Sequence, residues 1–117
     1  MRPVLIDAFR ADGTIEGYSI VKLSADGGVV QAAAATDKFV GVAEKPGGAE
    51  GQHVSVHRLG ITEVRLGGSV SAGSEITSDA KGFGIALTGA GESIGRAECG
   101  GVAGDIIPVF LRPLTIN

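Results

Sequence analysis

The sequence predicts an all-β protein built as a small, compact sandwich or barrel. Glycine, often beside Asp or Ser, recurs about every ten residues, and the runs between these turns are short and rich in β-branched side chains. No apolar pattern with a helical period extends beyond the short run 32–35, so long helices are not expected. An internal repeat of about 55 residues favours a pseudo-symmetric scaffold over a catalytic cleft.

The repeat is clearest between residues 40–59 and 94–112. When Pro46 is left unmatched, seven of nineteen aligned pairs are identical: Gly41/Gly95, Ala43/Ala97, Glu44/Glu98, Gly47/Gly100, Gly48/Gly101, Gly51/Gly104 and Val56/Val109. Glycine-containing turns at 26–28 and 81–83 also correspond. We therefore expect two repeats, at about 13–60 and 69–113, related by a pseudo-two-fold axis.

The turns divide the chain into strands. These are expected over residues 19–23, 29–33, 39–44, 53–59, 61–66, 74–77, 84–87, 93–97 and 106–111. Residues 13–117 then form a single β domain, and residues 1–12 form an extended N-terminal arm. Pro3 disfavours a helix at the start of the arm, and the segment 1–6 is apolar apart from Arg2. We expect the arm to gain order by pairing as an added strand with a neighbouring subunit or another protein.

The two repeats differ at one strand face. Strand 53–57 alternates inward-facing valines with outward-facing polar residues. The matching strand 106–110 is apolar at its outward positions as well, which are occupied by Ile106, Pro108 and Phe110. We expect the arm or another subunit to cover this face, because an exposed apolar strand promotes aggregation. Pro108 lacks an N–H donor and predicts an edge strand or a bulge.

Composition argues against several classes of partner. The net charge is −3, the ten Lys and Arg residues are scattered, and aromatic residues make up 4% of the chain. Nucleic-acid binding is not expected, because it requires a basic patch or a stacking platform. Cys99 is the only cysteine, which fits a reducing compartment. No apolar stretch is long enough for a signal peptide or a membrane span.

Catalytic and metal-binding patterns are weak. Residues 91–95 match the Gly-x-Ser-x-Gly pattern, but a strand and a turn follow where the nucleophile elbow requires a helix. His53 and His57 lie about 13 Å apart in an extended strand, too far to share one metal ion. Cys99 has no partner in the CxxC pattern and no neighbouring His. We expect no enzymatic activity, no metal and no cofactor.

Three successive segments resemble the small capsid cement, or head-decoration, proteins of tailed bacteriophages and prophages. They read AATDKFVGVAE from Ala34, GITEVRLGGSVSAGSEIT from Gly60, and IGRAE from Ile94 followed by AGDII from Ala103. The resemblance runs from about Gly13 to Leu114 and implies a compact β fold, which we expect to be β-tulip or β-clip-like. It also implies a homotrimer that binds the outside of the shell of major capsid protein and cements the phage head.

The resemblance carries expectations about sites and location. The protein would be made in the host bacterial cytoplasm and would lie on the outer surface of the virion. The arm is expected to contact the capsid through Met1, Arg2, Pro3, Val4, Leu5 and Ile6. The subunit interface is expected at Ile106, Pro108 and Phe110. The alternative is a β-clip-type module that binds a small ligand or a carbohydrate, which would require a pocket with convergent polar groups.

Overall fold

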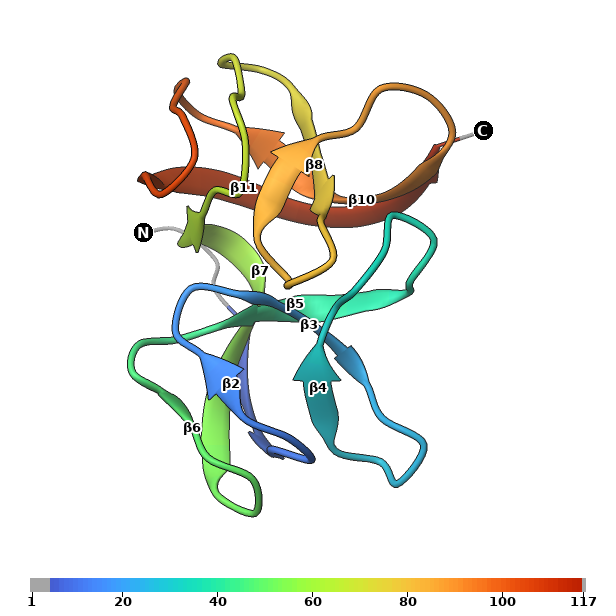
Figure 1. Cartoon of the computed structure of the whole chain (residues 1–117), viewed down its shortest axis with the longest axis vertical. Helices are drawn as coiled ribbons and strands as arrows, with labels where there is room; N and C mark the ends of the chain where they lie inside the picture. The colour runs from blue at the N-terminus through green and yellow to red at the C-terminus, as the bar shows by residue number, and fades with distance from the viewer. Residues whose placement is uncertain (1–4, 117) are drawn as a thin grey trace.

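The computed structural model describes residues 5–116, which form eleven strands and no helix (Figure 1). The strands are β1 (Leu5–Arg10), β2 (Ile15–Glu16), β3 (Ile20–Leu23), β4 (Val29–Gln31), β5 (Phe39–Ala43), β6 (Gly47–Gly48), β7 (His53–Arg65), β8 (Glu75–Ser78), β9 (Gly84–Ala86), β10 (Gly91–Ala97) and β11 (Ile106–Ile116). The predicted all-β class is confirmed. Within residues 5–116 there is no helix that could span a membrane.

The strand order shows the duplication. The main sheet has the order β4-β3-β5-β7-β11-β10-β8-β9, with β1 also paired to β7, while β2 and β6 form a separate ribbon. Four strands of the first repeat have counterparts at the mirrored positions in this order: β4/β9, β3/β8, β5/β10 and β7/β11. The registers agree, since Ala43 lies opposite Val56 and Ala97 lies opposite Val109.

Two glycines occupy equivalent close contacts. A Cβ atom on Gly41 would lie 2.2 Å from the carbonyl oxygen of His57, and one on Gly95 would lie 2.0 Å from that of Phe110. Neither distance leaves room for a side chain. The aligned glycines of the sequence repeat are therefore required by close strand packing.

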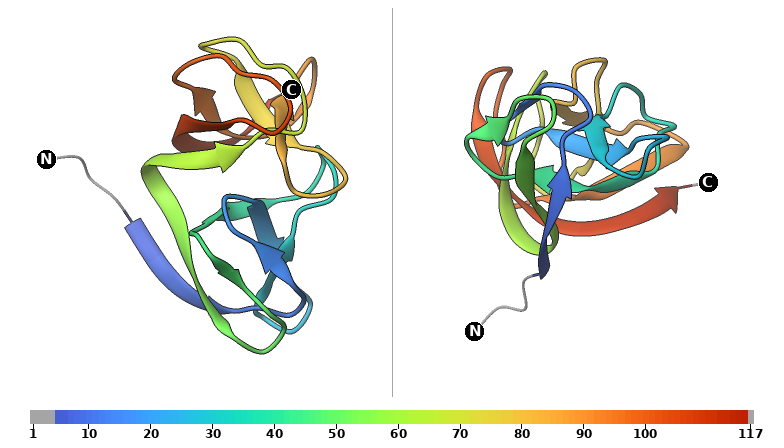
Figure 2. Two further views of the ribbon diagram at one scale, coloured as in Figure 1. Left: turned by 60° about the vertical axis from the view of Figure 1, so that its left-hand side comes forward. Right: turned by 90° about the horizontal axis from the view of Figure 1, so that it is seen from below.

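Strand β7 belongs to both repeats. Its first half pairs with β1 and β5, and its second half pairs with β11. Gly60 lies at the junction with a φ of 94°, and Figure 2 shows β7 bending as it passes from one repeat to the other. The predicted strands 53–59 and 61–66 are thus one bent strand. Glycine suits the bend because other residues rarely adopt this conformation.

The N-terminal segment is a strand of the first repeat rather than a separate arm. β1 pairs with β7 of its own chain, from Leu5 opposite Leu59 to Arg10 opposite His53. β1 is thus equivalent to the second half of β7, which pairs with β11 in the same way. Single bridges, Ala11–Val29 and Leu66–Gly84, link the corresponding ends of the two curled sheets. Residues 5–10 therefore gain order by pairing within the chain, and Met1–Val4 lie outside the described residues.

Pro108 lies in an interior strand, so the predicted edge position is wrong. β11 has β7 on one side and β10 on the other, and Pro108 lies opposite Glu63 of β7. The carbonyl oxygen of Pro108 accepts a hydrogen bond from the Glu98 amide, just beyond the end of β10. Proline is tolerated at this position because it lies beyond the last residue pair of β10 and β11. Its missing N–H therefore does not interrupt the hydrogen bonds between these two strands.

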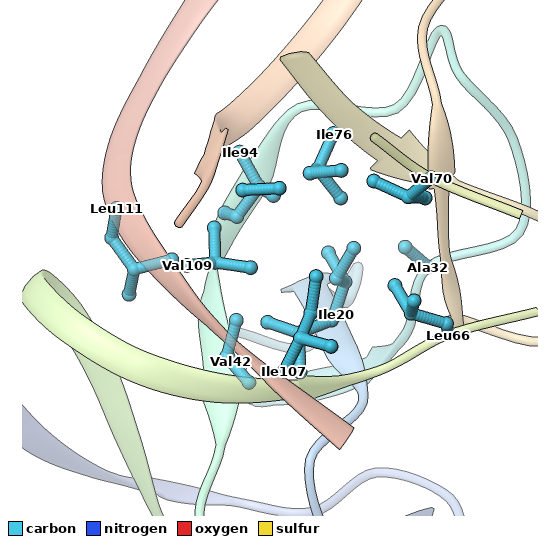
Figure 3. Close-up of a cluster of buried hydrophobic side chains, with 12 residues drawn as sticks. Ile20, Ala32, Val42, Leu66, Val70, Ile76, Ile94, Ile107, Val109 and Leu111 are labelled. Atoms are coloured by element: carbon cyan, nitrogen blue, oxygen red, sulfur yellow. The ribbon is translucent and has the colours of Figure 1, made fainter. Parts of the chain in front are cut away.

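The buried side chains form two clusters. The cluster of the first repeat contains Ala11, Ile15, Val21, Val29, Val40, Ala43, Val54 and Val56. The cluster of the second repeat contains the counterparts of these residues, except that Gly84 replaces Val29. It also contains three residues of the first repeat, namely Ile20, Ala32 and Val42 (Figure 3). One outer face of the first repeat therefore completes the core of the second.

The duplication is present, but the expected two-fold axis is not. Ile20 and Val42 are fully buried, whereas their counterparts Glu75 and Arg96 lie at the surface and pair with each other. The Ile20 amide also donates to the Gly82 carbonyl of the second repeat at 2.7 Å. A two-fold contact would use the same surface of both repeats. The repeats therefore pack head to tail.

A polar cluster occupies the free outer face of the second repeat. The Glu75 carboxylate accepts hydrogen bonds from Ser93 Oγ at 2.6 Å, Arg96 Nε at 2.8 Å and Arg112 Nη2 at 3.4 Å. Burial acts to raise the pKa of Glu75, but the Ser93 hydroxyl and the two guanidinium groups outweigh it and hold this pKa below its usual range. A charged face at this position ends the head-to-tail series after two repeats.

Exchanging residues between equivalent positions tests the head-to-tail contact. Val42→Arg places an uncompensated charge in the shared core and should lower the free energy of unfolding by about 3–5 kcal/mol. The reciprocal change, Arg96→Val, removes one exposed ion pair and should cost less than about 1 kcal/mol. Urea denaturation measures both values, and equal losses would contradict the asymmetry of the contact.

Stability should depend on pH through Glu75. Because its pKa is lower in the folded protein than in the unfolded chain, its stabilisation is complete above the unfolded value, about 4.3, and is lost as pH falls through the folded value. Glu75→Gln should therefore make the acid-side decline of the free energy of unfolding shallower. Glu50→Gln, in an exposed turn, is the matched control. An unchanged decline in Glu75→Gln would refute this role.

Candidate functional site

The predicted interface residues lie together on the outer face of β11. Ile106 and Phe110 are 44% and 43% exposed, and Pro108 between them is half-buried. Their cross-strand partners on β7 are Arg65, Glu63 and Ile61, opposite Ile106, Pro108 and Phe110 respectively. β1 does not cover this face, because it pairs with the first half of β7. The sequence predicts that either the arm or another subunit covers this face. Residues 5–10 of the arm do not cover it within one chain.

Charged residues border this apolar row on both sides. Glu63 and Arg65 lie on β7, while Arg96 of β10 lies opposite Phe110. Glu98 follows the end of β10 and bonds to the Pro108 carbonyl. An apolar centre with a polar rim is the usual anatomy of a protein interface. We call Ile106, Pro108 and Phe110 with their neighbour Ile61 the β11 face.

A second exposed apolar site lies at the bend of β7. Ile6 and Leu59 are 47% and 48% exposed. Leu59 lies opposite Leu5, and Ile6 lies opposite His57. Leu5 and Ile6 of the predicted capsid-contacting arm are therefore held on β7 beside the bend.

The structure also contains a cleft where the two repeats meet. It has a volume of about 580 Å³ and is lined by Tyr18, Glu44, Lys45, His57, Ile61, Thr62 and Glu63. The first four residues belong to the first repeat, and the last three belong to the second half of β7. His57 Nε2 lies 3.3 Å from Glu44 Oε1.

A second hollow adjoins the cleft. It has a volume of about 640 Å³, shares Tyr18 and Lys45 with the cleft, and extends to Arg65 and Ile106. Tyr18 is the only residue other than glycine with a positive φ, 66°, in residues 5–116. The sequence analysis missed this site because its residues come from separate segments. The available signal was the replacement of Cys99 and Phe110 by Lys45 and His57 in the aligned segments. The equivalence of Tyr18 and Gly73 follows from the hydrogen bonds of their amides to Ala43 and Ala97.

The other residues considered in the sequence analysis lie apart. His53 is exposed at the start of β7, and Cys99 is an exposed free thiol. Ser93 of the Gly-x-Ser-x-Gly pattern is buried in β10 and donates to Glu75. It is therefore not on a strand-to-helix turn. No group of three or more His, Cys, Asp or Glu suited to a metal ion occurs between residues 5 and 116.

Comparison with known proteins finds similarity to solved structures. No family model matches the sequence, and no curated protein matches it. The fold is similar to that in the crystal structure of the head fiber gp8.5 N base of bacteriophage phi29. The two chains are 18% identical, the match covers 98% of this chain and 99% of that one, and the TM-score is 0.73. At this level of identity the likeness establishes a shared fold.

Proposed function

We propose that this chain is a non-enzymatic structural protein of a bacteriophage head that binds the outer surface of the major capsid shell and stabilises it. The main support is the end-to-end fold likeness to the base of a phage head fiber. The resemblance of three sequence segments to capsid cement proteins points independently to the same location. The protein would reside on the virion.

The β11 face supports assembly into a homotrimer. An apolar row bordered by charges is stable in water only where its exposed area is small or a partner covers it. Ile106 and Phe110 lie on the same strand face with Pro108 between them, so a neighbouring subunit could bury all three at once. A closed ring of three matches threefold positions of a capsid lattice. The trimer would engage the shell through several contacts, so each one can be weak.

The N-terminal end of the chain is the proposed capsid contact. Among the described strands, β1 pairs only with β7, so its other edge can accept a strand from the capsid protein. Ile6 and Leu59 provide apolar area beside that edge. The other predicted contacts, Met1–Val4, precede β1 in the sequence and lie outside the described residues.

The proposed trimer interface is tested by Phe110→Asp. The substitution places an unpaired charge in a dry contact and should weaken assembly by about 2–4 kcal/mol per interface. Leu23→Asp is the matched control, because Leu23 is also exposed, at 57%, but lies on β3. Analytical ultracentrifugation should show a trimer for the parent chain and the control, and dissociation for Phe110→Asp. A monomeric parent chain would exclude this assembly.

Attachment to the shell is tested by adding the protein to undecorated, expanded capsids. The protein should sediment with the capsids and raise their melting temperature, because it binds the assembled lattice and not the dissociated subunits. Binding should weaken only mildly with added salt, since the net charge is −3 and the basic residues are scattered. Failure to bind the cognate shell, or turnover of a small substrate, would contradict the proposal.

A further inference from the structure

Comparing equivalent positions of the two repeats distinguishes residues that the fold requires from residues that it does not. Positions needed for strand packing are identical in both repeats, as in Gly41/Gly95, Ala43/Ala97 and Val56/Val109. Several other equivalent positions differ strongly in chemistry, and three of them are Tyr18/Gly73, Lys45/Cys99 and His57/Phe110. In the first repeat all three of these residues line the cleft of about 580 Å³. The cleft is therefore one of the places where the first repeat differs from the second.

Tyr18 shows this specialisation most clearly. Its φ of 66° is strained for a side chain with a Cβ atom, and Gly73 has a φ of 84° at the equivalent position. The backbone makes two hydrogen bonds there, from the Tyr18 amide to Ala43 O at 2.8 Å and from the Arg65 amide to Tyr18 O at 3.0 Å. Glycine would make both bonds without strain. A tyrosine at this position therefore carries a backbone cost that glycine would avoid.

The lining of the cleft disfavours several ligand classes. Glu44 and Glu63 would repel a phosphate or another anion, and Lys45 would weaken the attraction of these carboxylates for a cation. A fully apolar ligand would leave the polar groups of Glu44, Lys45 and Thr62 without partners, which is unfavourable. The lining combines groups that only accept hydrogen bonds with groups that only donate them. A neutral molecule bearing several hydroxyl groups satisfies both kinds.

We propose that this cleft binds a neutral oligosaccharide. Sugar hydroxyls would donate to Glu44 and Glu63 and accept from Lys45, while the apolar face of a sugar ring would pack on Tyr18. The volume lies within the usual range for small-ligand sites, about 300–1,000 Å³. The second hollow shares Tyr18 and Lys45 with the cleft, so a chain of sugars can continue past these two residues. The site is inferred from its lining and not from the proposed attachment to a capsid. It adjoins the proposed trimer interface, because Ile61 of the β11 face lines the cleft and Ile106 lines the second hollow.

Titration with defined sugars tests the assignment. The probes are maltohexaose, cellohexaose and N-acetylchitohexaose, with inorganic phosphate and calcium chloride as alternatives, each followed by NMR of the backbone amides. At least one oligosaccharide should bind saturably and shift the amides of Tyr18, Lys45 and Thr62. Phosphate and calcium should leave these amides unchanged. Binding of phosphate or calcium at the cleft, or no response to any of the oligosaccharides, would overturn the proposal.

Tyr18→Gly separates a binding role from a structural one. The variant should melt at the same or a higher temperature, because the backbone strain is relieved, and should bind the oligosaccharide at least about tenfold more weakly. Lys45→Ala should also weaken binding, whereas Lys81→Ala, in an exposed turn away from the lining, should not. Unchanged binding by Tyr18→Gly would refute the site. Sedimentation of Tyr18→Gly with capsids should remain normal, which keeps this test separate from that of the capsid proposal.

Discussion

The burial of Ile20 and Val42 of the first repeat in the core of the second is the interaction on which the structure depends. A unit of about 55 residues encloses little apolar volume by itself, and this chain builds its core without tryptophan. The head-to-tail contact joins the two repeats around one enlarged cluster, and the bend of β7 at Gly60 provides the covalent connection. Glu75 and Arg96 occupy the corresponding face of the second repeat with charge, so the contact forms once within the chain.

Functional chemistry is found where the repeats differ. His57 and Phe110 occupy equivalent positions, and each has its carbonyl oxygen against the equivalent glycine, Gly41 or Gly95. His57 lines a polar cleft, whereas Phe110 contributes to the exposed β11 face. The scaffold holds both side chains through the same backbone register. One duplicated position therefore contributes to two surfaces with different chemistry, a polar cleft and an exposed apolar face.

Most strands could be predicted because glycine turns mark their ends and aligned glycines mark the repeat. The place of β1 in the first repeat was harder to predict. Only two of its residues are identical to those at equivalent positions of β7, in the pairs Ile6/Ile61 and Arg10/Arg65. Sequence identity also establishes that two segments are equivalent without saying how they pack, so the two-fold axis was a wrong inference. The β11 face followed from alternation along one strand. The cleft did not, because it combines residues from separate segments.

We propose that this tandem β fold is a component of a phage head, attached through surfaces that the second repeat and the N-terminal strand present. A cryo-EM reconstruction of expanded shells incubated with the protein can test this attachment. We expect added density for three copies at threefold positions on the outer surface. In this density the β11 faces would be buried between copies, and β1 would be directed toward the shell. Absence of added density on the cognate shell, or copies attached singly through the Glu75 face, would contradict the account.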